Sequence, residues 1–253
     1  MRLMTFNLRF ATPVDGPNEW EFRKELVVEV ILNHRPDLLG TQEGTAPQLQ
    51  FLTEHLPGYR PLTDHRQVDP TCQYPTIFYR ADRFHVQESN EFWLSETPGV
   101  HRSLSWGSAF PRLATYGLFR EKGRTTGFYF INTHLDHISE AARLEGARMI
   151  RNYFFSLNLP IILVGDFNEP PEDPVYQELL GGDSPLRDTW RAVHPREEEA
   201  TTQHGFDGKL KGHRIDWILV TPPFQVGRAA VVADSQEGRY PSDHFPYEAE
   251  VEY

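Results

Sequence analysis

Residues 161–168, with the one-letter sequence IILVGDFN, constrain the fold more than any other stretch of the chain. Four consecutive aliphatic residues between a proline and a glycine predict a short strand that is buried on both faces. Such strands lie at the centre of sheets in layered α/β folds, and binding sites form at their C-terminal ends. Asp166 and Asn168 stand at that end. Because side-chain direction repeats every second residue, both are predicted to project to the same side.

An isolated Gly-Asp-x-Asn pattern is more often a turn, in which the aspartate caps the backbone and the asparagine adopts a positive φ. Three other predicted strands end in a similar way, however. Asn7 lies near the end of the strand predicted over residues 2–8, Glu43 ends the one over 37–43, and His134 follows the one over 126–133. This repetition favours a functional interpretation in which the strand ends share one site.

The remaining predicted elements alternate as in α/β proteins. Helices are predicted from residue 17 or 18 to 35, at 47–56, after Ser139 and at 175–180, from caps and apolar residues at helical spacing. Further strands are predicted at 76–79, 84–86, 114–121, 214–220 and 225–233, and after residue 246. No linker-like segment or internal repeat interrupts this order, so we expect a single domain over residues 1–253.

Composition limits the class of protein. The chain has no run of 18 apolar residues that would span a membrane, and Arg2, Asn7 and Arg9 are wrong for a secretory signal. The single cysteine, Cys72, excludes an internal disulfide and fits a reducing compartment. We therefore expect a cytoplasmic protein with no obligate protein partner.

The net charge of −11 argues against indiscriminate binding of long nucleic acids to a wholly basic surface. It allows a polyanionic substrate, because bound divalent cations invert the field at an acidic site. Acids and amides at strand ends suit hard cations such as Mg²⁺ or Mn²⁺. Zinc is disfavoured because the chain has neither an H-E-x-x-H motif nor a second cysteine. Serine hydrolase, P-loop and dinucleotide-binding motifs are absent as well.

Six short motifs, in chain order, carry a resemblance to a known family: Thr5-Phe6-Asn7, Gln42-Glu43, Asn132-Thr133-His134, Gly165-Asp166-Phe167-Asn168, Arg214-Ile215-Asp216 and Ser242-Asp243-His244. With these motifs the chain resembles the endonuclease/exonuclease/phosphatase superfamily of metal-dependent phosphohydrolases. The match runs from residue 5 to residue 244. Phrases at 18–20, 92–95 and 132–137 resemble a microbial branch nearer to deadenylases than to apurinic endonucleases.

The resemblance implies a four-layer α/β sandwich, in which two packed mixed β-sheets are flanked by helices. It also implies hydrolysis of a phosphate ester by in-line attack of a water molecule that Mg²⁺ or Mn²⁺ activates. Glu43 would be the principal metal ligand, and Asn7 and Asp243 would assist it. On local evidence alone, Asn7 is nearly as well explained as a turn-forming residue as it is as a metal ligand.

The resemblance also gives roles to five catalytic residues. Asp166 would orient or deprotonate the attacking water, and Asn168 would hold that water or a phosphate oxygen. His244 would face the scissile phosphate while Asp216 fixes its tautomer, unless the two form only a structural ion pair. His134 would donate to a non-bridging oxygen, although a lone histidine is more often structural.

Substrate binding is expected from Asn132, Arg112, Arg102 and Trp106. The arginines could clamp a phosphate, and Trp106 or Phe110 could stack on a base. Aromatic residues in exposed loops pack into small satellite cores as often as they bind a ligand. Loops 62–75, 95–112 and 194–213 would set selectivity, the acidic run Glu197-Glu198-Glu199 is expected to be a solvated face, and the histidines expected at the surface are His101, His137 and His204.

The predicted function is a divalent-metal-dependent phosphoesterase, first of all a phosphodiesterase or nuclease acting on nucleic acid or a nucleotide. A hydrolase of inositol phosphates or phospholipid head groups is the enzyme alternative, although no apolar hairpin that would enter a bilayer is evident. A binding module without catalysis is disfavoured, because every expected catalytic residue type is present.

Overall fold

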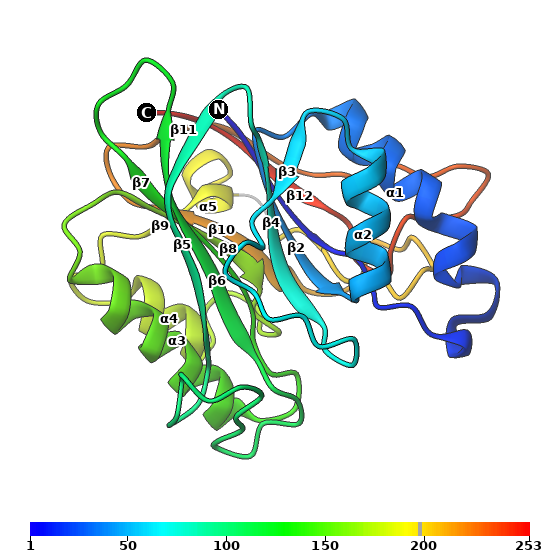
Figure 1. Cartoon of the computed structure of the whole chain (residues 1–253), viewed down its shortest axis with the longest axis horizontal. Helices are drawn as coiled ribbons and strands as arrows, with labels where there is room; N and C mark the ends of the chain where they lie inside the picture. Colours follow the sequence, from blue (N-terminus) through cyan, green and yellow to red (C-terminus); the bar gives the residue numbers. More distant parts are fainter. Residues whose placement is uncertain (197–198) are drawn as a thin grey trace.

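The computed structural model describes residues 1–196 and 199–253, in which the strands form two six-stranded sheets (Figure 1). The first sheet contains, in spatial order, β11 (Gln225–Val231), β12 (Tyr247–Glu252), β1 (Arg2–Asn7), β2 (Leu38–Gly44), β4 (Tyr74–Arg80) and β3 (Tyr59–Pro61). The second contains β5 (Phe84–Trp93), β6 (Leu113–Glu121), β7 (Phe128–His134), β8 (Ile161–Asp166), β10 (Asp216–Val220) and β9 (Arg187–Asp188). Both sheets are mixed, since β1 pairs with β2 and β7 with β8 in parallel.

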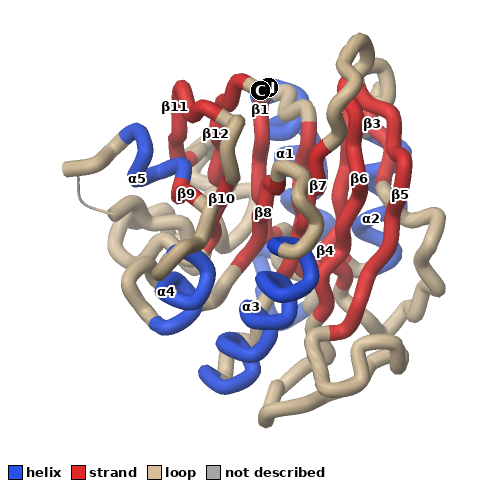
Figure 2. The backbone as a smooth tube through the Cα atoms, turned by 90° about the vertical axis from the view of Figure 1, so that its left-hand side faces the viewer, coloured by secondary structure: helices blue, strands red, loops and turns tan. Residues whose placement is uncertain are grey.

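Helices lie on the outer faces of the two sheets, as Figure 1 and Figure 2 show from two sides. The first sheet is covered by α1 (Trp20–His34) and α2 (Ala46–His55), and the second by α3 (Glu140–Phe155) and α4 (Pro174–Leu180). A 3-10 helix, η1 (Pro13–Asn18), precedes α1, and α5 (Thr189–Val193) follows β9. The expected four-layer sandwich is therefore confirmed. No helix in the described ranges is long and apolar enough to cross a membrane.

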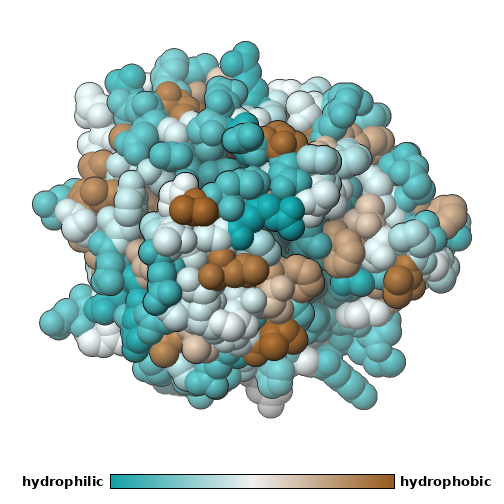
Figure 3. All heavy atoms as spheres, turned by 60° about the horizontal axis from the view of Figure 1, so that its bottom comes forward, coloured by the Kyte–Doolittle hydropathy of each residue, from teal (hydrophilic) through white to brown (hydrophobic). Residues whose placement is uncertain are grey.

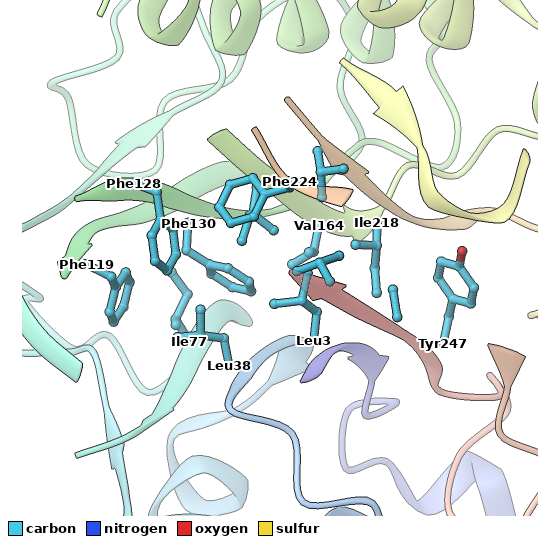
Figure 4. Packing of buried hydrophobic residues seen from close by; sticks show 14 of the residues in the cluster. Leu3, Leu38, Ile77, Phe119, Phe128, Phe130, Val164, Ile218, Phe224 and Tyr247 are labelled. Atoms are coloured by element: carbon cyan, nitrogen blue, oxygen red, sulfur yellow. The ribbon is translucent and has the colours of Figure 1, made fainter. Parts of the chain in front are cut away.

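Three apolar clusters fill the three gaps between these four layers. One lies between α1, α2 and the first sheet, and another lies between α3, α4 and the second sheet. The third lies between the two sheets (Figure 4), where it includes Leu3, Leu38, Phe128, Phe130, Ile162, Val164, Ile218 and Val220. Burial of this apolar surface is the main force that holds the layers together.

The two sheets pack closely against each other around Asn132. A Cβ on Gly40 of β2 would lie 2.6 Å from the Val164 side chain and 2.8 Å from Asn132 Oδ1. Asn132 Nδ2 donates to the carbonyl oxygens of Thr41 and Thr76 at 2.9 and 3.1 Å. The structure thus places Asn132 fully buried between the sheets, and this corrects its predicted role in substrate binding. The alternation that puts it on the side of His134 also puts it inside the sandwich.

Most predicted elements are present, with shifted ends. The first helix begins at Trp20 rather than at 17 or 18, because Gly16 kinks the preceding segment with φ 53°. Strands β3 and β9 and helix α5 were not predicted, since two to five residues are too few to show a period. Glu197 and Glu198 lie outside the described residues. Glu199 is no mere solvated residue, because its Oε2 accepts from Arg214 Nε at 2.6 Å.

Candidate active site

Strand register brings three polar strand ends together at one edge of the second sheet. His134, the last residue of β7, is the parallel partner of Asp166, the last residue of β8. Asp166 is also the antiparallel partner of Asp216, the first residue of β10. All three residues are at most 4% exposed. Like charges that face each other across a strand pair destabilise a sheet, so this arrangement indicates a functional site.

Gly165 permits the close pairing of β7 and β8 next to Asp166. A Cβ on Gly165 would lie 2.2 Å from the carbonyl oxygen of Thr133, and its φ of 153° is one that L residues rarely adopt. The glycine of the Gly-Asp-x-Asn motif is therefore required by the backbone of the neighbouring strand.

Asn7 and Glu43 bring the first sheet into the site. Asn7 Nδ2 donates to Asp166 Oδ2 at 2.9 Å and to Glu43 Oε1 at 3.3 Å. The Asn7 amide oxygen accepts from the Arg9 backbone N–H at 2.9 Å, and Glu43 Oε2 accepts from the Phe10 N–H at 3.0 Å. Asn7 thus aligns two carboxylates across the sheets, whereas a direct metal ligand would present its amide oxygen to the ion.

Unusual backbone conformations occur at these strand ends. Glu43, Asn168 and Arg9 have φ angles of 60°, 52° and 53°, and the β2–β4 register shifts between Thr41 and Gly44. Such conformations and bulges are concentrated at functional sites. The Asn168 N–H donates to Asp166 Oδ1 at 2.9 Å. The turn considered as an alternative is therefore present, and it turns the Asn168 side chain toward His134.

His244 lies between two carboxylates. Its Nδ1 lies 2.8 Å from Asp216 Oδ2, and its Nε2 lies 3.9 Å from Asp166 Oδ2. Burial disfavours the imidazolium, but the charge and hydrogen bond of Asp216, together with Asp166, raise the pKa of His244 well above 6.5. These contacts therefore favour the charged form of His244.

His134 has the opposite charge state. Its Nδ1 lies 3.0 Å from Arg112 Nη1, and its Nε2 lies 3.0 Å from Asn168 Nδ2 and 3.4 Å from Asp166 Oδ2. Burial, together with the charges of Arg112 and His244, lowers the pKa of His134 well below 6.5. The pKa values of two buried imidazoles beside one aspartate are thus shifted in opposite directions, a separation typical of acid–base sites.

Asp243 joins the cluster from the segment before β12. Ser242 Oγ donates to the Asn7 carbonyl oxygen at 2.6 Å, which ties this segment to β1. Asp243 Oδ2 lies 3.9 Å from Arg9 Nε. The hydrogen bonds from Arg9 to Asp15 are the main cause that raises the pKa of Arg9, and the charges of Asp243 and Glu43 raise it further. Glu43 and Asp243 therefore lie on the same rim.

The acidic donor set fits a hard divalent cation. Burial and the charge of Asp216 raise the pKa of Asp166 to about 7, and Asp216 Oδ1 is a buried oxygen without a hydrogen-bond partner among the described residues. Ligand atoms of Asp166, Asp216 and His244 lie within 4.8 Å of one another. A divalent cation held next to these acids would supply the missing positive charge.

A cavity of about 150 Å³ opens beside this cluster. Glu43, His134 and Arg112 form its inner wall. The outer wall comes from two of the three loops that were predicted to set selectivity, with Thr71, Cys72, Gln73 and Pro75 from one and Arg102, Phe110 and Pro111 from the other. The cavity therefore connects the polar strand ends to the loops.

The predicted substrate-binding residues of the 95–112 loop differ in position. Arg102 lines the cavity, but its Nη1 donates to Asp69 Oδ2 at 3.0 Å and clips the two loops together. The Trp106 carbonyl oxygen accepts from Ser139 Oγ at 2.7 Å at the start of α3, and Trp106 is not among the described residues that line the cavity. Of these two residues, only Arg102 is placed to meet a bound molecule.

Arg112 is also placed differently from the predicted phosphate clamp. Its side chain is 10% exposed, and its two terminal nitrogens lie 3.0 and 3.2 Å from Nδ1 of His134 and His137. Both arms of the guanidinium therefore already face imidazoles, and this is not the geometry of a two-armed phosphate clamp. Sequence spacing alone could not show this, because His134 and His137 follow a different strand.

One further expectation is corrected, and the residue after Leu135 takes a separate position. His204 is 7% exposed and stacks on Phe245 with ring centroids 3.8 Å apart, and burial lowers its pKa to about 4. Asp136 does not continue the face of His134, because β7 ends there and Asp136 Oδ1 accepts from the Ile138 and Ser139 N–H groups at 3.0 and 2.7 Å. His101 and His137 are exposed, as expected.

Several apolar side chains are exposed, and one of them, Phe110, lines the cavity. Figure 3, which brings the lower side of Figure 1 forward, shows apolar residues as separate brown spots among polar ones. The sequence showed no apolar hairpin because these residues come singly from three segments. Examples from the 62–75 and 95–112 loops and from the turn before α3 are Val68, Val100, Leu104, Phe110 and Ile138.

Sequence reasoning missed Arg9, Thr71 and Gln73. Arg9 lies beyond the end of β1, where its φ of 53° breaks the strand alternation, so the sequence pattern could not place it. Thr71 and Gln73 lie in an irregular loop, where no period exists to indicate which side chains face the cavity.

Comparison with known proteins is consistent with this geometry. The model of the Endonuclease/Exonuclease/phosphatase family matches residues 4–244. A solved mannosyl-6-phosphatase from Bacteroides thetaiotaomicron is 32% identical, with a TM-score of 0.89 and full coverage of both chains. The human nocturnin catalytic domain, at 23% identity and a TM-score of 0.72 over 100% of this chain and 93% of that one, shows the fold alone.

Curated relatives are more distant. Nocturnin of Drosophila melanogaster is 27% identical over 89% of this chain, and nocturnin of Mus musculus is 24% identical over 90% of it. The chain spans 41% of the fly protein and 56% of the mouse protein. Because the family model covers nearly the whole chain, this chain belongs to the Endonuclease/Exonuclease/phosphatase family, whose members here are hydrolases of phosphate esters.

Proposed function

We propose that this enzyme uses Mg²⁺ or Mn²⁺ to hydrolyse a small phosphate ester whose leaving group is one hydroxylated ring. The observation that carries the proposal is the cavity of about 150 Å³ beside Glu43 and His134. A cavity of this size accommodates a single six-membered ring. A continuous nucleic acid strand would need an open groove lined with positive charge.

The cavity wall has the mixed character that suits a sugar or cyclitol ring. Thr71, Gln73 and Arg102 offer hydrogen-bonding groups, whereas Pro75 and Leu113 offer apolar surface. Hydroxyl groups and C–H faces of such a ring need both kinds of contact. The full-length similarity to a mannosyl-6-phosphatase supports this substrate class.

The surrounding side chains have separate roles in the proposed reaction. Glu43 and Asp243 would hold the cation, aligned by Asn7, and the bound ion would neutralise phosphate charge and favour ionisation of a water. Asp166 orients that water and accepts its proton, with Asn168 beside it. The His244 cation, held by Asp216, faces a phosphate oxygen, and neutral His134 donates to another.

A substrate panel with each cation tests the proposal. We expect hexose 6-phosphates and inositol monophosphates to be hydrolysed with kcat/KM at least about tenfold above dinucleotides and oligonucleotides, because only the former fit the cavity. Preferential cleavage of oligonucleotides would contradict it. The Asp166→Ala variant controls for contaminating phosphatases in every assay.

A second candidate is a nucleotide or nucleic acid phosphodiester. It is favoured by Phe110, which lines the cavity and is 54% exposed, so that a base could stack on it. Under this candidate, Phe110→Ala raises KM for dinucleotides severalfold and leaves KM for hexose phosphates unchanged. Phospholipids belong in the same panel, because the exposed ring of Phe110 at the cavity could meet an acyl chain.

A further inference from the structure

Both ring nitrogens of His134 face hydrogen-bond donors. Arg112 Nη1 lies 3.0 Å from Nδ1, and Asn168 Nδ2 lies 3.0 Å from Nε2. A neutral imidazole has one N–H and one acceptor nitrogen, so it can accept only one of these two bonds. The identity of the stronger donor therefore decides which nitrogen of His134 carries the proton.

Arg112 is the stronger donor of the two. Its guanidinium cannot act as an acceptor, and charge-assisted hydrogen bonds are roughly twice as strong as neutral ones. The Asn168 amide has another acceptor, because Nδ2 also lies 3.0 Å from the Leu135 carbonyl oxygen. A proton on Nδ1 would point at Arg112, whereas a proton on Nε2 points toward Asp166 Oδ2, 3.4 Å away.

We propose that Arg112 is a positioning residue that holds His134 in the tautomer with hydrogen on Nε2, so that His134 presents a neutral N–H donor to the phosphate. The catalytic part of this inference rests on the proposed function, whereas the tautomer itself does not. With the other tautomer, an Nε2 lone pair would face Asp166 Oδ2, 3.4 Å away, and would offer no donor to a phosphate bound beside it.

The segment after β7 is built around this arginine. Asp136 Oδ2 lies 3.8 Å from Arg112 Nε, and Asp136 is itself fixed by the Ser139 and Ala109 N–H groups at 2.7 and 2.9 Å. The second terminal nitrogen faces His137 Nδ1 at 3.2 Å. Residues 134, 136 and 137 thus all face the guanidinium of Arg112. This shared partner explains why the three side chains lie together.

Nitrogen-15 NMR of the histidine rings in the Mg²⁺-loaded protein tests the tautomer directly. We expect the His134 resonances, assigned by their loss in His134→Gln, to show a non-protonated Nδ1 and a protonated Nε2. A protonated Nδ1 in the wild-type protein would overturn the proposal. This result does not depend on substrate identity, so it remains decisive even if the substrate panel yields no activity.

Arg112→Met removes the donor while keeping a long side chain, and Arg148→Met, at the exposed surface of α3, is the matched control. We expect Arg112→Met to populate the Nδ1–H form and to lower kcat about 10²-fold with KM changed less than threefold. A large rise in KM at constant kcat would instead indicate a phosphate clamp and overturn the proposal. If the variant does not fold, the wild-type spectrum still decides.

Discussion

The space between the two sheets has an apolar half and a polar half, although the same strands build both. On inward-facing positions, β7 runs from Phe128 and Phe130 to Asn132 and His134. β8 runs from Ile162 and Val164 to Asp166, β1 from Leu3 to Asn7, and antiparallel β10 from Val220 and Ile218 to Asp216. Each strand therefore contributes to stability at one end and to the site at the other.

This difference shows that one alternation pattern can serve two purposes. The apolar half removes hydrocarbon surface from water, whereas the polar half buries acids and imidazoles that cost free energy unless they are paired. We therefore expect substitutions in the polar half to change the rate of catalysis, and substitutions in the apolar half to change the free energy of unfolding.

The largest effect is expected for Asp166→Asn in the polar half. The variant loses the carboxylate that receives the water proton, so kcat should fall about 10³-fold or more. It also relieves repulsion with Asp216, so the free energy of unfolding, measured in EDTA, should change by less than about 1 kcal/mol. Steady-state kinetics and urea unfolding check the pair of outcomes, and a strongly destabilised variant would contradict the division into halves.

In the apolar half, Phe130→Ala should have the reverse effect. Phe130 is fully buried between the sheets, so its truncation should lower the free energy of unfolding by about 4 kcal/mol. The fraction that stays folded should keep kcat within about threefold of the wild type. A fall in kcat without destabilisation would show that the halves are coupled.

Asp188→Asn is the matched control for Asp166→Asn, because Asp188 is a buried carboxylate away from the site. It pairs with Arg214, a residue with no exposed surface. Breaking this pair should cost about 3 kcal/mol, because buried Arg214 then keeps only Glu199 as a carboxylate partner, with kcat unchanged at a temperature where the variant is folded. Calorimetry and kinetics under those conditions would sharpen the contrast with Asp166→Asn.

Sequence reasoning found the strands and their polar ends because both follow from local pattern. The order of elements implies that neighbouring strands have their polar ends at the same edge of the sheet. This brings together Asp166, Asp216 and His134. Sequence reasoning failed at Asn132, because this side chain points inward like His134 but lies deeper between the two sheets. It also failed at Arg112 and Trp106, since the path of the 95–112 loop depends on tertiary contacts that leave no periodic signal.

A smaller effect is expected outside both halves, at Glu91 on the edge strand β5. Burial disfavours its ionised form, but hydrogen bonding to His65 and the charge of Arg66 prevail and lower the pKa of Glu91 below 4.5. A carboxylate with a lowered native pKa stabilises the fold above its unfolded pKa, and this stabilisation is lost as pH falls through the native pKa. Glu91→Gln should therefore reduce the acid-induced loss in the free energy of unfolding, by less than about 1 kcal/mol. Melting temperatures measured across the acidic pH range check this.

The central claim is that carboxylates from distant strands form one cation site, and calorimetric titration with Mg²⁺ or Mn²⁺ tests it most directly. Glu43→Gln and Asp243→Asn should each weaken binding at least about tenfold, and both should reduce the rise in melting temperature that the ion produces. Glu178→Gln, on α4, should bind like the wild type. Unchanged affinity in both site variants would contradict the account.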